Sequence, residues 1–214
     1  MPFFTNPMDS IFYILILIIS VVAHEVAHGY VAYKFGDQTA KMAGRLTINP
    51  IPHLDLFGSI LLPIILVVTN AGFLFGWAKP VPVNSANFRP EVRKKALFFV
   101  SIAGIVVNLI IATFFSLIIR SSMFFVIPSS IIEISALIVF LNILLAVFNA
   151  VPVPPLDGSG ILFSLLPDRF SRFEKMASAY TLPLFIIVVF FVWPIVSPLV
   201  FWIFNLMTGI SFNL

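Results

Sequence analysis

Three titratable side chains, His24, Glu25 and His28, interrupt a mostly apolar run at residues 11–35. A run of this length is enough for a helix that crosses about 30 Å of hydrocarbon, which takes about 20 apolar residues. Ionisable groups inside a membrane each cost at least about 2.5 kcal/mol unless they are paired or bind a metal ion. The sequence offers them few charged partners, so the run is predicted to be a membrane helix that carries a functional site.

The spacing of the three side chains predicts a metal site. Residues four apart lie on one face of a helix, so His24 and His28 can present two imidazole nitrogens to one ion. Glu25 is turned by about 100° from His24, which places its carboxylate beside the ion, where it is suited to act as general base for a metal-bound water. The motif alone also occurs by chance on surface helices, but the membrane setting favours metal binding.

The composition predicts a polytopic membrane protein. Of the 214 residues, 60% are hydrophobic and 10% are charged, whereas soluble domains carry about 25% charged residues. The chain has no cysteine, so a metal ion must be held by histidine and carboxylate groups. The net charge is only +3 and the basic residues cluster in short loops, which indicates orientation in a lipid membrane and not nucleic-acid binding.

The fold is predicted to be all-α, with about five to six transmembrane segments. Besides the first helix, at residues 10–35, the apolar stretches are 56–75, 96–119, 131–148 and 181–204. Three prolines break the last stretch, which is either one kinked span or two half-spans. Neither a soluble stretch nor an internal repeat is found, so residues 1–214 are predicted to form a single membrane-embedded domain.

Charge asymmetry predicts that the motif lies near the cytosolic face of the cell membrane. Lys34, Lys41 and Arg45 follow the first helix and only Asp9 precedes it. The positive-inside rule therefore places the C-terminal end of this helix in the cytosol. His28 lies about 10 Å from that end, at 1.5 Å per residue.

Residues 72–88 are predicted to be a re-entrant or partly extended segment. By the positive-inside rule, Arg93 should lie in the cytosol, as Asp55 does. The chain must then cross the membrane an even number of times between these two residues, but only one apolar helix is available there. Irregular backbone at membrane depth must be covered by protein or water, and its free edge could pair with an extended peptide. An external loop is the alternative. The candidate substrate-binding residues are Gly76, Trp77, Lys79, Pro80, Val81 and Val83.

The polar connection after the first helix contains weaker signals. Residues 43–48 could form a short strand, and Asn49 with Pro50 indicates a turn. His53 and Asp55 end the connection. An interfacial, solvated pair is favoured there over a role for these residues as metal ligands or in supporting the ligands.

A candidate third metal ligand follows the helix at residues 131–148. Three prolines after Asn149 end that helix and give an extended turn, which leads to Asp157 on the cytosolic side, at about the depth of His28. Asp157 is therefore the predicted third ligand. Other carboxylates look solvated in loops or lie at an outer helix end: Asp37, Asp55, Asp168 and Glu133.

Two asparagines inside predicted helices, Asn108 and Asn142, are candidates for supporting the metal site. Asn108 shares a helix face with Gly104, and Asn142 shares one with Asn149. Small and amide residues also join helices in membrane bundles. Helix packing is therefore an equal alternative for both asparagines.

Three motifs in this order resemble the site-2 protease family of intramembrane zinc metalloproteases, in its compact microbial branch without accessory domains. They are His24-Glu25-xx-His28, the Gly-Trp-Ala-Lys-Pro-Val-Pro run from Gly76, and Asn149-xx-Pro152-xxxx-Asp157-Gly158. The resemblance spans about residues 20–160. It implies that His24, His28 and Asp157 hold Zn²⁺, that Glu25 is the catalytic base, and that Asn149 helps to bind the substrate or the developing oxyanion. It also implies that the substrates are single membrane spans of other proteins.

The predicted activity is that of a zinc endopeptidase that hydrolyses peptide bonds within or near transmembrane segments, as in regulated intramembrane proteolysis. A transporter or channel is one alternative, since polar residues in membranes line ion paths, but its charges should spread along several spans. A di-iron oxidase would need more than the three histidines present. A catalytically inactive binding relative is the last alternative, against which an intact Glu25 argues.

Overall fold

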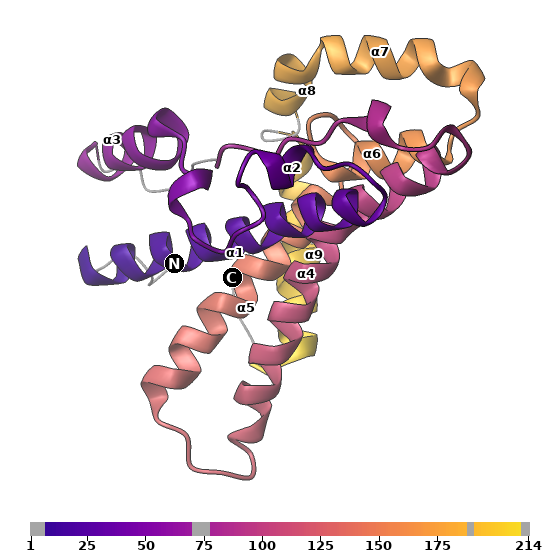
Figure 1. The fold of residues 1–214 in the computed structure, drawn as a ribbon. Helices are drawn as coiled ribbons and strands as arrows, with labels where there is room; N and C mark the ends of the chain where they lie inside the picture. The colour runs from indigo at the N-terminus through magenta and orange to yellow at the C-terminus, as the bar shows by residue number, and fades with distance from the viewer. Residues whose placement is uncertain (1–6, 70–77, 188–190, 211–214) are drawn as a thin grey trace. The chain divides into compact units, whose positions relative to one another are not determined.

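The computed structural model describes residues 7–69, 78–187 and 191–210, and its elements are shown in Figure 1. All regular secondary structure in these residues is helical, which confirms the all-α class. Three helices among them are long and apolar enough to cross a membrane: Ile11–Lys34, Pro90–Ser121 and Ser129–Asn149. The total of five to six spans stays a prediction. The chain divides into two compact units, Met1–Arg89 and Pro90–Leu214.

The first unit is built around α1 (Pro7–Lys34), the helix that carries the titratable motif. The helix ends where Gly36 adopts a positive φ of 104°, a conformation that glycine reaches without steric cost. The short helix α2 (Thr39–Met42) follows and packs against α1. The next elements are η2 (Ile51–His53), η3 (Leu56–Leu61) and α3 (Leu62–Val68).

The predicted strand at residues 43–48 is wrong. The backbone there bends, and its polar groups bond locally: the N–H of Arg45 donates to the carbonyl of Ala40 at 2.9 Å. The carbonyl of Thr47 lies 3.0 Å from Nε2 of His53. A strand needs a partner strand to satisfy its backbone, and these contacts replace one.

The predicted solvated pair of His53 and Asp55 is also wrong for His53. Its side chain is fully buried, with Nε2 against the Thr47 carbonyl. Asp55 is partly buried and accepts from the N–H groups of Phe57, at 3.1 Å, and Gly58, at 2.7 Å. This carboxylate satisfies N–H groups that have no partner within the helix that follows. Asp55 therefore caps the first helix of the predicted apolar stretch 56–75. Residues 70–75 of that stretch lie outside the described part of the chain.

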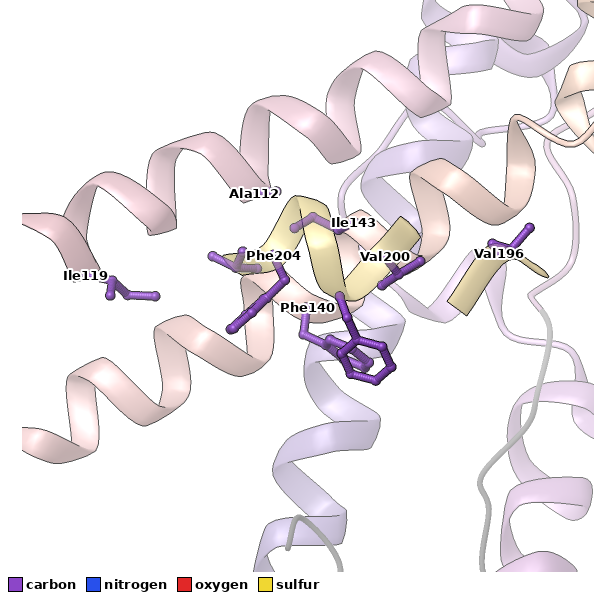
Figure 2. Close-up of a cluster of buried hydrophobic side chains, with 9 residues drawn as sticks. Ala112, Ile119, Phe140, Ile143, Val196, Val200 and Phe204 are labelled. Atoms are coloured by element: carbon purple, nitrogen blue, oxygen red, sulfur yellow. The ribbon is translucent and has the colours of Figure 1, made fainter. Parts of the chain in front are cut away.

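The second unit contains a hairpin of two long helices, α4 (Arg93–Ser121) and α5 (Ser129–Asn149), visible in Figure 1. Their bounds agree with the predicted spans 96–119 and 131–148 to within a few residues. The helix α9 (Trp193–Thr208) packs against both. Figure 2 shows the buried cluster at their junction. Its residues are Ala112 and Ile119 from α4, Val139, Phe140 and Ile143 from α5, and Val196, Val200, Phe201 and Phe204 from α9.

The cluster explains why α9 stays on the hairpin. Val196, Val200 and Phe204 are four apart, so they form one face of α9. The ring of Phe140 lies 5.6 Å from that of Phe201 and 6.2 Å from that of Phe204, measured between centroids. Aromatic pairs at such distances contribute about 0.5–1.5 kcal/mol beyond the burial of their area.

The short helix η5 (Pro90–Val92) comes directly before α4. Four further helices lie between α5 and α9: α6 (Asp157–Leu165), η6 (Asp168–Phe170), α7 (Ser171–Ala179) and α8 (Thr181–Ile187). The helix α6 packs closely on α4, because a Cβ at Gly160 would lie only 2.2 Å from Oγ of Ser101. The predicted tail 181–204 therefore corresponds to α8 and α9, with residues 188–190 outside the described part.

Arg120, at the end of α4, holds the end of α9. Its Nε donates to the carbonyl of Met207 and its Nη2 to that of Leu206, both at 2.6 Å. We expect Arg120→Gln to lower the melting temperature of the purified protein by a few degrees, because about 1 kcal/mol is typical for such bonds at an exposed site. Thermal unfolding in detergent measures the shift. Arg93→Gln is the matched control, and an equal loss of stability there would contradict the explanation.

Candidate metal centre

The two histidines of the motif form a pair on α1. The ring centroids of His24 and His28 are 4.6 Å apart, with an interplanar angle of 78°, and both side chains are buried. Two nitrogens bound to one tetrahedral zinc at about 2.05 Å are about 3.3 Å apart, a distance that rings this close can provide. The pair therefore fits two ligand positions of one zinc ion.

Glu25, between them in sequence, contacts a distant part of the chain. Its Oε2 accepts from the backbone N–H of Val81 at 2.7 Å. Residues 78–84 have no helical structure, and this bond places them against α1. This hydrogen bond restricts the rotation of the Glu25 carboxylate.

Two further bonds hold residues 78–84, which we call the docked segment. The N–H of Lys79 donates to the carbonyl of His53 at 2.8 Å. The N–H of Asn84 donates to Oδ2 of Asp37 at 2.7 Å. The lack of helix at residues 78–84 is consistent with the partly extended segment predicted for residues 72–88, whereas Ser85–Asn87 form a short 3-10 helix, η4. Gly76 and Trp77 lie outside the described part of the chain, and a re-entrant path stays a prediction.

Asp37 is a structural residue that sequence reasoning placed in solvent, and that prediction is wrong. The side chain is fully buried and accepts from Asn84, from Nδ2 of Asn87 at 2.7 Å, and from the N–H and hydroxyl of Thr39. Burial alone would raise the pKa of Asp37, but these donors outweigh it and hold the pKa below its usual value. The carboxylate is therefore charged at neutral pH. The Asp-x-Thr spacing just after a helix end is a signal that could have indicated this role.

In the second unit, Asp157 is the first residue of α6 and is partly buried. The following residue, Gly158, packs directly on the end of α5: a Cβ there would lie 2.2 Å from the carbonyl oxygen of Ala150 and 2.5 Å from that of Val151. Only glycine permits this approach. It brings the start of α6 to the backbone that immediately follows Asn149.

The three asparagines named as candidates lie on α4 and α5. Asn108 and Asn142 are fully buried, and Nδ2 of Asn142 donates to the carbonyl of Ile138 at 2.9 Å. Nδ2 of Asn149 donates to the carbonyl of Leu145 at 3.0 Å. An amide nitrogen carries two hydrogens, so this bond uses one donor of Asn149. The supporting roles of Asn108, Asn142 and His53 stay predictions.

The comparisons with known proteins agree with this chemistry. Residues 126–192 match the sequence profile of peptidase family M50. The chain is 42% identical over 202 residues to "Putative zinc metalloprotease YwhC" of Bacillus subtilis, which covers 91% of this chain and 87% of that protein. It is 29% identical over 201 residues to "Putative zinc metalloprotease Rip2" of Mycolicibacterium smegmatis, covering 91% of this chain and 73% of that protein. No solved structure gives a significant match.

The identity to YwhC extends over most of both chains, and the family profile names the same kind of peptidase. The donor set agrees with both, because the buried imidazole pair on α1 is chemically suited to zinc. The chain therefore belongs to peptidase family M50, the site-2 protease family, and is a zinc metalloprotease.

Proposed function

We propose that this zinc metalloprotease cuts peptide bonds within or near transmembrane segments of other membrane proteins. One observation carries the proposal: His24, Glu25 and His28 lie inside Ile11–Lys34, a helix apolar and long enough to cross a membrane. A protease with its catalytic groups at membrane depth meets substrates that share the membrane with it. The site lies near the cytosolic face of the cell membrane, by the distribution of basic residues.

The proposed zinc ligands are His24, His28 and Asp157. The imidazole pair supports the first two. For Asp157, the support is its carboxylate chemistry and its place in the Asn149-to-Gly158 motif. Zinc held by these residues would act as a Lewis acid and would lower the pKa of a bound water toward 7. Histidine and carboxylate are the ligand types available to a chain without cysteine.

Glu25 is the proposed general base. It takes the proton of the attacking water and passes it to the nitrogen of the leaving amine. Because Oε2 already accepts from the Val81 N–H, Oε1 is the proposed oxygen for the proton exchange. The remaining amide hydrogen of Asn149 is the proposed donor to the oxyanion.

The docked segment is the proposed binding edge for an unwound substrate. In an extended chain, successive residues direct their N–H and C=O groups to opposite sides. The N–H groups of Lys79 and Val81 bond to the protein's own acceptors, and the carbonyls of Pro80 and Pro82 are the proposed acceptors for a substrate strand. Proline has no N–H, and this edge therefore accepts hydrogen bonds from a substrate strand without donating at these two positions. Gly76, Trp77 and Val83 extend the proposed contact.

A cross-linking prediction tests this edge. The side chain of Val81 is only 7% exposed, whereas that of Val83 is partly exposed. In the Glu25→Gln background, a cysteine at Val83 should form a disulfide with a cysteine near the cleavage point of a bound substrate. Val81→Cys is the matched control and should cross-link weakly. Rapid labelling of Val83→Cys by an impermeant thiol reagent from outside the cell, without a substrate cross-link, would assign the segment to an external loop.

The proposed topology has five to six spans, with a re-entrant path near residues 72–88, in one membrane-embedded domain that contacts lipid. A transporter or channel lacks support now that the family is known. An inactive relative that binds membrane spans without cutting them is the remaining alternative. It would bind zinc and substrate and release no fragments.

A cleavage assay in lipid vesicles tests the function. The purified protein is mixed with a panel of single-span fusion proteins, half of which carry helix-breaking residues in the span. We expect cuts within or near the spans, faster with helix breakers, abolished by a zinc chelator and restored by added zinc. Cleavage of an unfolded soluble polypeptide with no cleavage of any span would overturn the intramembrane proposal. If the protein binds zinc and substrate but releases no fragments, it is the inactive relative.

A further inference from the structure

We infer that Gly29 and Asp37 are positioning residues that set the distance between the Val81 N–H and the Glu25 carboxylate. Neither residue is a metal ligand or the base in the function proposed above, and the inference rests on that function only for the role of Glu25. It follows from contacts within the first unit.

Gly29 determines how closely the docked segment approaches α1. It lies four residues after Glu25, so the two share a helix face. A Cβ at this position would lie 2.7 Å from Cγ1 of Val81, 2.8 Å from Cδ2 of Leu46 and 3.1 Å from Cβ of Ala40. Leucine can rotate away, but the branched side chain of valine is stiff at χ1. A methyl group at position 29 would therefore push Val81, and with it the N–H that holds Glu25.

Asp37 determines where the docked segment ends along α1. Its Oδ2 accepts from the N–H of Asn84, three residues beyond Val81, and its Oδ1 accepts from Nδ2 of Asn87. Charged acceptors make the stronger hydrogen bonds in proteins. An isosteric Asp37→Asn change would place an amide N–H₂ against one of these donors, and the segment would lose one of its attachments.

The contacts of Gly29 and Asp37 both affect the distance between the Val81 N–H and Oε2 of Glu25. Gly29 lets Val81 come close to the face of α1 that carries Glu25, and Asp37 prevents the segment from sliding. Between them, the Val81 N–H reaches Oε2 of Glu25 at 2.7 Å. A carboxylate without this bond can rotate, and displacement of a catalytic group by about 1 Å can cost about 100-fold in rate.

The first experiment uses size. Gly29→Ala should lower kcat on a single-span substrate by about 10- to 100-fold, with zinc content and KM unchanged. The double variant Gly29→Ala/Val81→Ala removes Cγ1 of Val81, the atom nearest to the added methyl group, and it should recover most of the lost kcat. An unchanged kcat in Gly29→Ala would overturn the inference. So would an equal loss in the single and double variants when both keep zinc and the wild-type melting temperature.

The second experiment measures the docked segment without catalysis. Val81→Cys provides a single buried thiol, because the chain has no cysteine of its own. In Asp37→Asn/Val81→Cys, the thiol should react with a maleimide about tenfold faster, as expected when one charged hydrogen bond against local opening is lost. Asp55→Asn/Val81→Cys is the matched control, since asparagine caps helices as well as aspartate does, and its rate should stay unchanged.

Equal labelling rates in the Asp37 and Asp55 variants would overturn the positioning role of Asp37. This readout does not depend on proteolysis. If Glu25→Gln were fully active, the proposed base would be wrong, and the labelling rates would still decide whether Asp37 holds the docked segment. The two failures are therefore distinguishable.

Discussion

In Glu25→Gln, we expect about one zinc ion per chain and a loss of proteolysis of at least about 100-fold, because a general base contributes roughly 10²–10⁴-fold to rate. Glutamine keeps the shape of the side chain and its Oε can still accept from the Val81 N–H. It cannot take a proton from water at neutral pH. Metal analysis of the purified protein, beside cleavage of a single-span fusion in vesicles, measures both quantities.

Glu133→Gln is the matched control for this change. Glu133 lies near the start of α5 with an exposed side chain, and its loss should leave both zinc content and cleavage at the wild-type level. Full activity of Glu25→Gln would remove Glu25 from the mechanism. Loss of zinc in Glu25→Gln would instead make this carboxylate a ligand.

In Asp157→Ala, we expect zinc affinity to fall by more than about 100-fold, and activity with it. Changes next to metal ligands already cost about 10–100-fold in affinity, so loss of a ligand should cost more. Titration of the metal-free protein with zinc in competition with a chelator measures the affinity. The melting temperature is recorded in parallel, since a change in fold would lower zinc binding for another reason.

Asp55→Ala and His53→Ala are the controls for the third ligand. Asp55 caps η3 through its carboxylate, and the His53 ring bonds the Thr47 carbonyl, so both have structural roles that account for them. Their zinc affinity should equal that of the wild type. If Asp157→Ala binds zinc normally while one of these two does not, the third ligand has been assigned to the wrong residue.

The helices were predictable from local patterns. The predicted first helix at residues 10–35 is Pro7–Lys34, and the hairpin helices are found within a few residues of their predicted ends. Long apolar runs become helices because a membrane offers no other partner for backbone N–H and C=O groups. The family could also be named from spaced motifs, since the motif on α1 and the Asn149-to-Gly158 run each preserve local geometry.

The environments of polar residues in the connections were not predictable in the same way. Asp37 and His53 look like ordinary loop residues in sequence, yet both are fully buried. Their partners are the Asn84 N–H for Asp37 and the Thr47 carbonyl for His53. Whether a polar side chain is solvated depends on which backbone groups fold back over it, and a loop sequence does not encode this by period or spacing.

Residue patterns alone were enough to predict the all-α class, the long apolar helices, the imidazole pair and the family, because each is recognised from apolar runs or from motifs that are short in themselves. The folded chain was needed to show that the Val81 N–H binds Glu25 and that Asp37 accepts from the Asn84 N–H. It also showed that a Cβ at Gly29 would lie 2.7 Å from Cγ1 of Val81. These pairs are about 50 residues apart, and their contact depends on the path of the chain between them. Hydrogen bonds and close packing at that range are properties of the folded backbone, which no local pattern of residue types specifies.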